Sequence, residues 1–78
     1  MMTRMQKLMA SAVGFDVEIH FVGGFKSCIG KCTDYIQPLD NDPEVASIYI
    51  KIPGRSSLYE FTEEEIEKLI IKNNASAN

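Results

Sequence analysis

The chain has no tryptophan, a single histidine and only two cysteines among its 78 residues. It also lacks any apolar run near the roughly 20 residues that cross a bilayer. Arg4 and Lys7 stand near the N-terminus, but no continuous apolar segment follows them, which argues against a secretory signal. We therefore expect a cytoplasmic protein that does not enter a membrane.

The cysteines and the histidine are too few, and wrongly spaced, for a metal or redox site. Cys28 and Cys32 lie about 13 Å apart along one strand, whereas a disulfide needs Cα atoms within roughly 7 Å. Their spacing also differs from that of zinc and redox motifs. His20 has no second histidine and no well-placed nucleophile beside it. We expect free thiols, no metal, no cofactor and no catalytic residue, and therefore no enzyme.

The length allows a single domain, which we assign to residues 1–72, with a disordered polar tail over 73–78. A chain of this size buries only about 60–65% of its unfolded surface, so its stability is marginal unless a partner shares the core. The net charge of −3 is uneven, because residues 1–33 carry four basic and two acidic side chains and the rest carry four and nine. This balance does not predict steering of the whole protein toward a phosphate backbone.

The N-terminal segment has the pattern of an amphipathic helix over residues 3–13. Thr3 and Gln6 have the spacing of a capping box. An apolar stripe at helical spacing follows, and its members are Met5, Leu8, Met9 and Ala12. Two interpretations stay open: the helix covers an open end of the sheet, or it binds a partner.

From residue 15 the apolar period changes to two, which predicts a sheet over residues 15–61. Gly23 and Gly24 predict a hairpin turn. Gly30 lies inside the second strand and predicts a bend, a bulge or a close backbone crossing. The expected strands cover residues 15–22, 26–37, 46–52 and 57–61. The fold class is mainly β (α+β): a small, strongly bent antiparallel β-barrel of four to five strands, with an N-terminal helix and a short C-terminal helix.

The sequence predicts a C-terminal helical segment over residues 62–71. Thr62 and Glu65 form a second capping box, and the acids of that first turn suit the helix dipole. Apolar residues continue at helical spacing, which favours a helical segment over 62–71. A single helical turn followed by a short strand, Leu69 to Lys72, fits the same residues.

The candidate binding residues are basic side chains and tyrosines that folding would bring together. Lysine beside tyrosine is a common surface for single-stranded nucleic acid, through stacking and phosphate attraction. It is equally common in protein interfaces. The candidates are Lys26, Lys31, Tyr35, Tyr49, Lys51 and Arg55.

The order of elements resembles the small barrels of the Sm-like and SH3-like groups. The stretch from Val17 to Asp34 is similar to the first Sm motif, with glycines at 24 and 30. The ending from Leu58 to Ile66 resembles the YolD-like bacterial proteins. Five residues separate the two glycines where the Sm pattern has four, and Ile36-Gln37-Pro38 stands where an apolar-Asn pair is expected. The second-motif Arg-Gly is reversed to Gly54-Arg55, so no RNA-site residue is carried over from the family.

These observations predict a non-enzymatic interaction module of a bacterial cytoplasm. A small core, an apolar first helix and unpaired sheet edges favour a homo-oligomer that also binds an unidentified protein. The alternative is RNA or single-stranded DNA binding through the basic and tyrosine residues.

Overall fold

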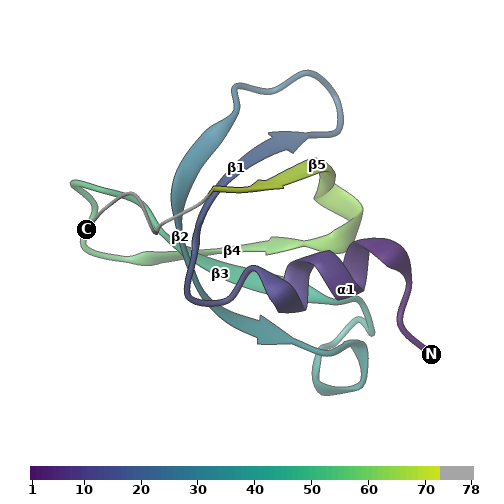
Figure 1. Cartoon of the computed structure of the whole chain (residues 1–78). Coiled ribbons are helices and arrows are strands. Elements are labelled where there is room, and N and C mark those ends of the chain that lie inside the picture. The colour runs from purple at the N-terminus through teal and green to yellow at the C-terminus, as the bar shows by residue number, and fades with distance from the viewer. Residues whose placement is uncertain (73–78) are drawn as a thin grey trace.

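The computed structural model describes residues 1–72, so the predicted disordered tail, 73–78, lies outside the described residues. The described chain folds into one sheet and one α-helix (Figure 1). Its elements are α1 (Arg4–Ser11), β1 (Asp16–Phe21), β2 (Cys28–Ile36), the 3-10 turn η1 (Pro38–Asp40), β3 (Ser47–Lys51), β4 (Leu58–Thr62), the 3-10 turn η2 (Glu63–Glu65) and β5 (Ile66–Ile71).

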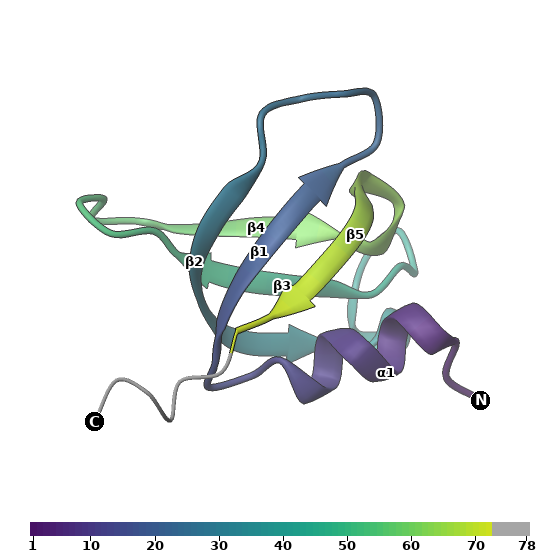
Figure 2. The same cartoon turned by 45° about the horizontal axis from the view of Figure 1, so that its top comes forward.

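The five strands form an antiparallel sheet in the order β4-β3-β2-β1-β5. Within residues 1–72, β4 and β5 each pair along one side only, so the hydrogen-bonded sheet is open. Figure 2 shows that β2 bends strongly, and that β1 and β5 cross over β3 and β4 at a steep angle. The expected antiparallel sheet with an N-terminal helix is confirmed.

The core lies between the concave side of the sheet and α1. Val17 and Ile19 of β1 and Ile48 and Ile50 of β3 are fully buried, as their period-two spacing predicts. Met9 of α1 is fully buried against them. Each buried aliphatic side chain of this size contributes about 1.5–3 kcal/mol relative to exposure. The helix therefore covers the sheet, which was one of its two interpretations.

Helix α1 begins where its capping box places it. The Thr3 hydroxyl accepts from the backbone N–H of Gln6, and the Gln6 side chain accepts from the backbone N–H of Thr3. The helix ends two residues before the predicted 13, at Ser11, because Ala12 caps it and Gly14 turns the chain at φ +92°. The N–H of Gly14 then donates to the carbonyl of Cys32 and joins the chain to β2.

Gly30 stands at a close backbone approach inside β2. A Cβ built there would lie 2.7 Å from the carbonyl oxygen of Lys51 and 2.6 Å from a methyl carbon of Ile50. The same strand carries a register shift between Cys32 and Asp34 where it pairs with β3. Of the alternatives predicted for Gly30, the close backbone crossing is confirmed at that residue, whereas the bulge lies farther along the strand. Only glycine fits at position 30 without displacing β3.

The C-terminal segment corrects the predicted helix over 62–71. Only the 3-10 turn η2 is helical there, and Ile66–Ile71 is a strand paired with β1. The helix-like spacing of Ile66 and Leu69 has a different cause. The register shifts between His20 and Phe21, which pair with Lys68 and Ile66 and leave one extra residue in β5. Because a bulge reverses the alternation of faces, both apolar side chains reach the core.

Ser47 also differs from expectation. The period-two pattern assigns it to the outer face with Tyr49, yet its side chain is fully buried. Its hydroxyl donates to Glu60 at 2.8 Å and accepts from Asn41 at 3.0 Å. Those two bonds allow a polar side chain to be buried at the start of β3.

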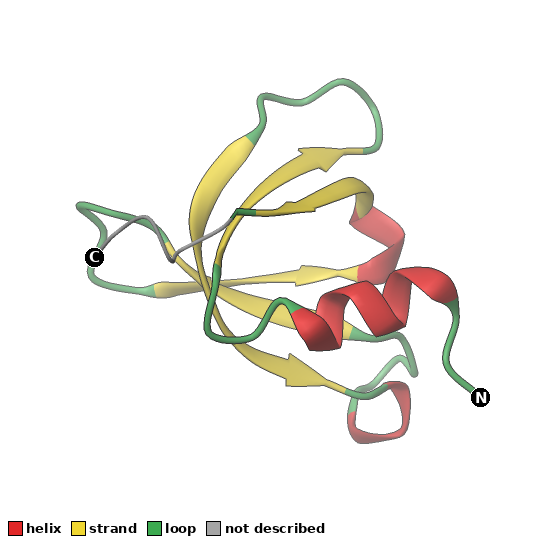
Figure 3. Ribbon diagram, viewed as in Figure 1, coloured by secondary structure: helices red, strands yellow, loops and turns green. Residues whose placement is uncertain are grey.

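No helix in the described part of the chain is long and apolar enough to cross a membrane. Helix α1 has eight residues. Figure 3 shows this helix and the turn between β4 and β5 near one another at one end of the molecule. Glu63 joins them, because its carboxylate accepts from the Thr3 hydroxyl at 3.0 Å and from the Gln6 amide at 2.9 Å.

Candidate functional site

Three of the four predicted basic residues come together at one end of the sheet. Lys31 of β2 and Lys51 of β3 are direct cross-strand neighbours, so their side chains leave the same face. Arg55 lies in the following turn, and the Lys51 ammonium donates to its backbone carbonyl at 2.7 Å. We call Lys31, Lys51 and Arg55 the basic cluster. Strand register, which the sequence does not display, produces this convergence.

Lys26 does not belong to that cluster. It lies in the loop between β1 and β2 and lines a pocket to which the other three predicted basic residues do not contribute. The prediction that all four cations converge is therefore wrong for Lys26.

The two predicted tyrosines lie on opposite faces of the sheet. Tyr49 pairs with Asp34 and Glu60 and shares the outer face with Lys51. Tyr35 instead pairs with Ile48, which is buried, and packs against the core. Its hydroxyl is buried and has no hydrogen-bond partner within the described residues. Burial, and then the negative charge of Glu63, raises the pKa of Tyr35.

The outer face that carries the basic cluster has mixed charge. Asp16 stands opposite Lys31 on the β1 side, and Asp34 and Glu60 flank Tyr49. On the same face Glu18 accepts from Lys72 at 3.1 Å and lies 2.7 Å from His20. The hydrogen bond from Lys72, and next the contact with His20, lower the pKa of Glu18. Acidic neighbours thus border the cations on the sheet surface.

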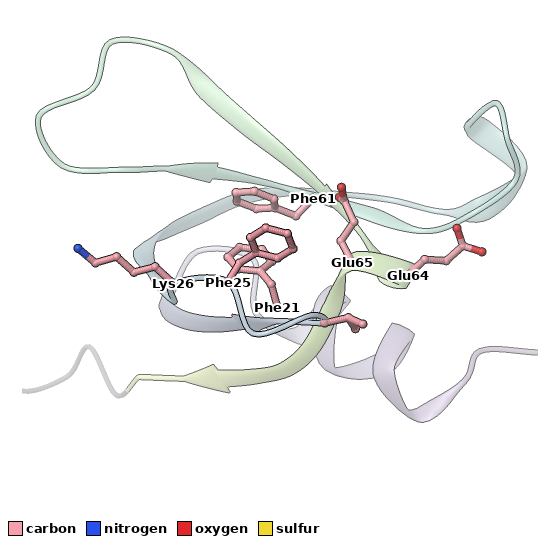
Figure 4. Close-up of a pocket in the computed structure, with 7 residues that line it drawn as sticks. Phe21, Phe25, Lys26, Phe61, Glu64 and Glu65 are labelled. Atoms are coloured by element: carbon pink, nitrogen blue, oxygen red, sulfur yellow. The ribbon is translucent and has the colours of Figure 1, made fainter.

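A second surface, which the sequence analysis missed, is an aromatic pocket of about 440 Å³. Figure 4 shows phenyl rings gathered from the end of β1, from the β1–β2 loop and from the end of β4. Phe21 and Phe61 are in contact, with ring centres 4.9 Å apart and planes at 57°. The residues of the aromatic pocket are Phe21, Val22, Phe25, Lys26, Phe61, Glu64 and Glu65.

The loop side of the aromatic pocket is unusually apolar for an exposed segment. Phe25 is 73% exposed and Val22 is 54% exposed. Gly23 and Gly24 both have positive φ and turn the chain between them. The sequence did contain a signal, since a phenylalanine directly after a two-glycine turn has no strand partner to cover it. The prediction treated that turn only as a connection.

Comparison of the chain with known protein families, curated proteins and solved structures found no match. The site is therefore interpreted from its own geometry.

The thiols have the properties of structural side chains. Burial raises the pKa of Cys32 to about 11, and burial also raises the pKa of Cys28. Both are free, as expected, and both hold their protons at neutral pH, which makes them poor nucleophiles. In residues 1–72 no three histidine, cysteine, aspartate or glutamate side chains are arranged to hold a metal ion.

Proposed function

We propose that this protein is a non-enzymatic interaction module that self-associates and binds protein partners through the edges of its sheet. The observation that carries this proposal is that β4 and β5 each leave one edge unpaired within residues 1–72. An exposed strand edge presents unpaired N–H and C=O groups, which a further strand satisfies.

The composition of the two edges supports pairing. β4 reads Leu58-Tyr59-Glu60-Phe61-Thr62 and holds neither proline nor lysine, the residues that usually protect an edge. β5 has four apolar residues among its six and one lysine. A chain of 8.7 kDa also gains stability when a partner strand extends its small core.

A solution mass measurement tests the proposal. Light scattering coupled to size exclusion should give a multiple of 8.7 kDa that rises with concentration. Leu58→Lys on β4 and Ile70→Lys on β5 should lower that mass, because a lysine at an edge opposes strand addition. A wild-type monomer at millimolar concentration would overturn the proposal.

Leu39→Lys is the matched control. Leu39 is 76% exposed and Leu58 is 47% exposed, but Leu39 lies in the 3-10 turn η1, outside the sheet. Its substitution should leave the mass unchanged. Circular dichroism on all three variants separates a lost interface from a lost fold.

The basic cluster favours a second candidate, binding of RNA or single-stranded DNA. Two like charges directly opposite on a sheet repel each other, and a phosphate between Lys31 and Lys51 would relieve that repulsion. Tyr49 on the same face offers a ring for base stacking. Contacts from three cations predict a slope of about −2 for log K against log salt. Fluorescence anisotropy with a labelled oligonucleotide at low salt tests this, and no binding there would reject it.

We further propose that the fold is a small barrel of the Sm-like or SH3-like kind, from a bacterial cytoplasm. The support is the order of elements: an N-terminal helix, a β2 that bends around Gly30, and one helical turn between the last two strands.

A further inference from the structure

We propose that the aromatic pocket binds an organic cation, the ammonium end of a lysine side chain, most strongly in N-methylated form, presented by a partner protein. The pocket is lined by side chains from strand ends and from the β1–β2 loop, and its proposed ligand does not depend on self-association. Three phenyl rings, two carboxylates and an open mouth carry the inference.

The rings form a preorganised corner. Phe21 and Phe61 meet at 57°, so the two rings are tilted against each other and are not stacked. Phe61 also stacks on Tyr59, with planes 9° apart and centres 6.5 Å apart. A cation within about 6 Å of such a ring face is attracted by the π-electrons. The two core-anchored rings therefore make one wall that needs no rearrangement.

Phe25 adds a third ring, from the loop. Its ring packs beside Gly23, where an added Cβ would lie only 3.1 Å from it. The loop is joined to the turn η2, because the N–H of Val22 donates to the carbonyl of Glu65 at 3.0 Å. Phe25 is thus positioned by the backbone around it, yet 73% of it remains exposed to solvent. A ligand group lying against the ring would cover that surface.

The two carboxylates favour a ligand with a positive charge. Glu65 is held in place by accepting from the backbone N–H of Thr62 at 2.9 Å. No hydrogen bond or ion pair within residues 1–72 engages the Glu64 carboxylate, and its side chain is exposed. Lys26 contributes its stem to the lining, while Figure 4 shows its ammonium directed away from the rings. Figure 4 shows the Glu64 carboxylate directed away from the rings as well, so two carboxylates and one ammonium leave the rim of the pocket with an excess of negative charge.

The volume of the aromatic pocket is large enough to accept a side chain of a partner. About 440 Å³ lies within the roughly 300–1,000 Å³ of small-ligand pockets. Methylation spreads the positive charge and enlarges the apolar surface of an ammonium group. Both changes favour a site made of phenyl rings over water.

The first test titrates ¹⁵N-labelled full-length protein with tetramethylammonium chloride, at constant ionic strength, and follows backbone amide shifts. The matched neutral probe is tert-butanol, which has a similar size and tetrahedral shape. We expect the cation to shift amides of Val22–Lys26 and of Phe61–Glu65, with tert-butanol binding at least about threefold more weakly. Equal binding of both probes, or cation shifts spread over the whole chain, would overturn the proposal.

Variants of the protein test whether the phenyl rings and the carboxylates of the pocket are responsible for tetramethylammonium binding. Phe25→Ala and Glu64→Gln should each weaken tetramethylammonium binding by about two- to fivefold. Phe15→Ala and Glu67→Gln remove an exposed phenyl ring and an exposed carboxylate outside the pocket and should change nothing. Unaltered affinity in Phe25→Ala would reject the pocket as the site.

A peptide pair tests the macromolecular form of the ligand. A short peptide carrying trimethyl-lysine should bind the aromatic pocket, and the same peptide with norleucine at that position should not. Equal binding of the two would overturn the proposal. Phe25→Ala should keep the wild-type solution mass, so failure of self-association and failure of this pocket give separate results.

Discussion

The basic cluster and the aromatic pocket are built in different ways. Strand pairing alone places Lys31 beside Lys51, and the surrounding acids balance much of their charge. The aromatic pocket joins two strand ends and a loop, and it leaves Phe25 uncovered. A surface made by strand register is rigid and already solvated. A surface made where strand ends and a loop meet keeps exposed apolar area, and a bound ligand would shield that area from water.

The largest expected effect comes from the strand that supports the basic cluster. Gly30→Ala should destabilise the protein by about 3 kcal/mol, near the upper end for overpacking, because the new Cβ meets the backbone of Lys51 at 2.7 Å. Gly24→Ala in the pocket loop meets open space and costs only the strain of its positive φ, about 1 kcal/mol. Urea unfolding of both variants measures the difference. Equal losses would contradict the close approach of the Lys51 backbone to position 30.

A middle-sized effect distinguishes the middle of β2 from its start by the pH dependence of the unfolding free energy. Cys32 is fully buried beside the basic cluster, and burial raises its pKa to about 11. The unfolded thiol loses its proton near pH 9, before the folded one, so this contribution is complete below pH 9 and is lost as the pH rises from 9 to 11. We expect a loss of up to about 2 kcal/mol over that window.

Two cysteine variants supply the control for that pH dependence. Cys32→Ala should flatten the decline of unfolding free energy between pH 9 and 11. Cys28→Ala should flatten it less, because Cys28 lies at the half-buried start of β2 near the pocket loop. Identical slopes in wild type and Cys32→Ala would contradict the assignment.

The smallest expected effect concerns charge within the basic cluster. Lys51→Gln removes the repulsion from Lys31 and should stabilise the fold by about 0.2–0.5 kcal/mol at low salt. The gain should fade as salt is added, since exposed charges are screened. Lys26→Gln, at the pocket, should show no such salt-dependent gain. Thermal unfolding at two salt concentrations checks both variants.

Much of the fold is visible in the sequence because it depends on neighbours along the chain. The cap formed by Thr3 and Gln6, the alternation around Val17 and Ile19, and the turn at Gly23 and Gly24 are each local signals. Each one has the structure it predicted. Gly30 is a signal of a contact that is not local. A glycine inside a strand indicates that a backbone segment distant in sequence lies close in space, but it does not say which segment.

The errors come from contacts between distant segments. One extra residue in β5 lets Ile66 and Leu69 both reach the core, which a sequence pattern cannot distinguish from a helix. Tyr35 lies on the inner face because the register shifts between Cys32 and Asp34. A bulge reverses every later side chain in its strand, yet it leaves no mark in local composition.

The sequence by itself determined most elements of this protein: the capped N-terminal helix, the alternating strands and the glycine turns. Only the tertiary structure decided which residues share a surface. Lys31 and Lys51 are 20 positions apart and Phe21 and Phe61 are 40 apart, so strand register and end-to-end convergence bring them together. The physical reason is that propensity acts over a few residues, whereas a binding surface depends on where separate segments meet.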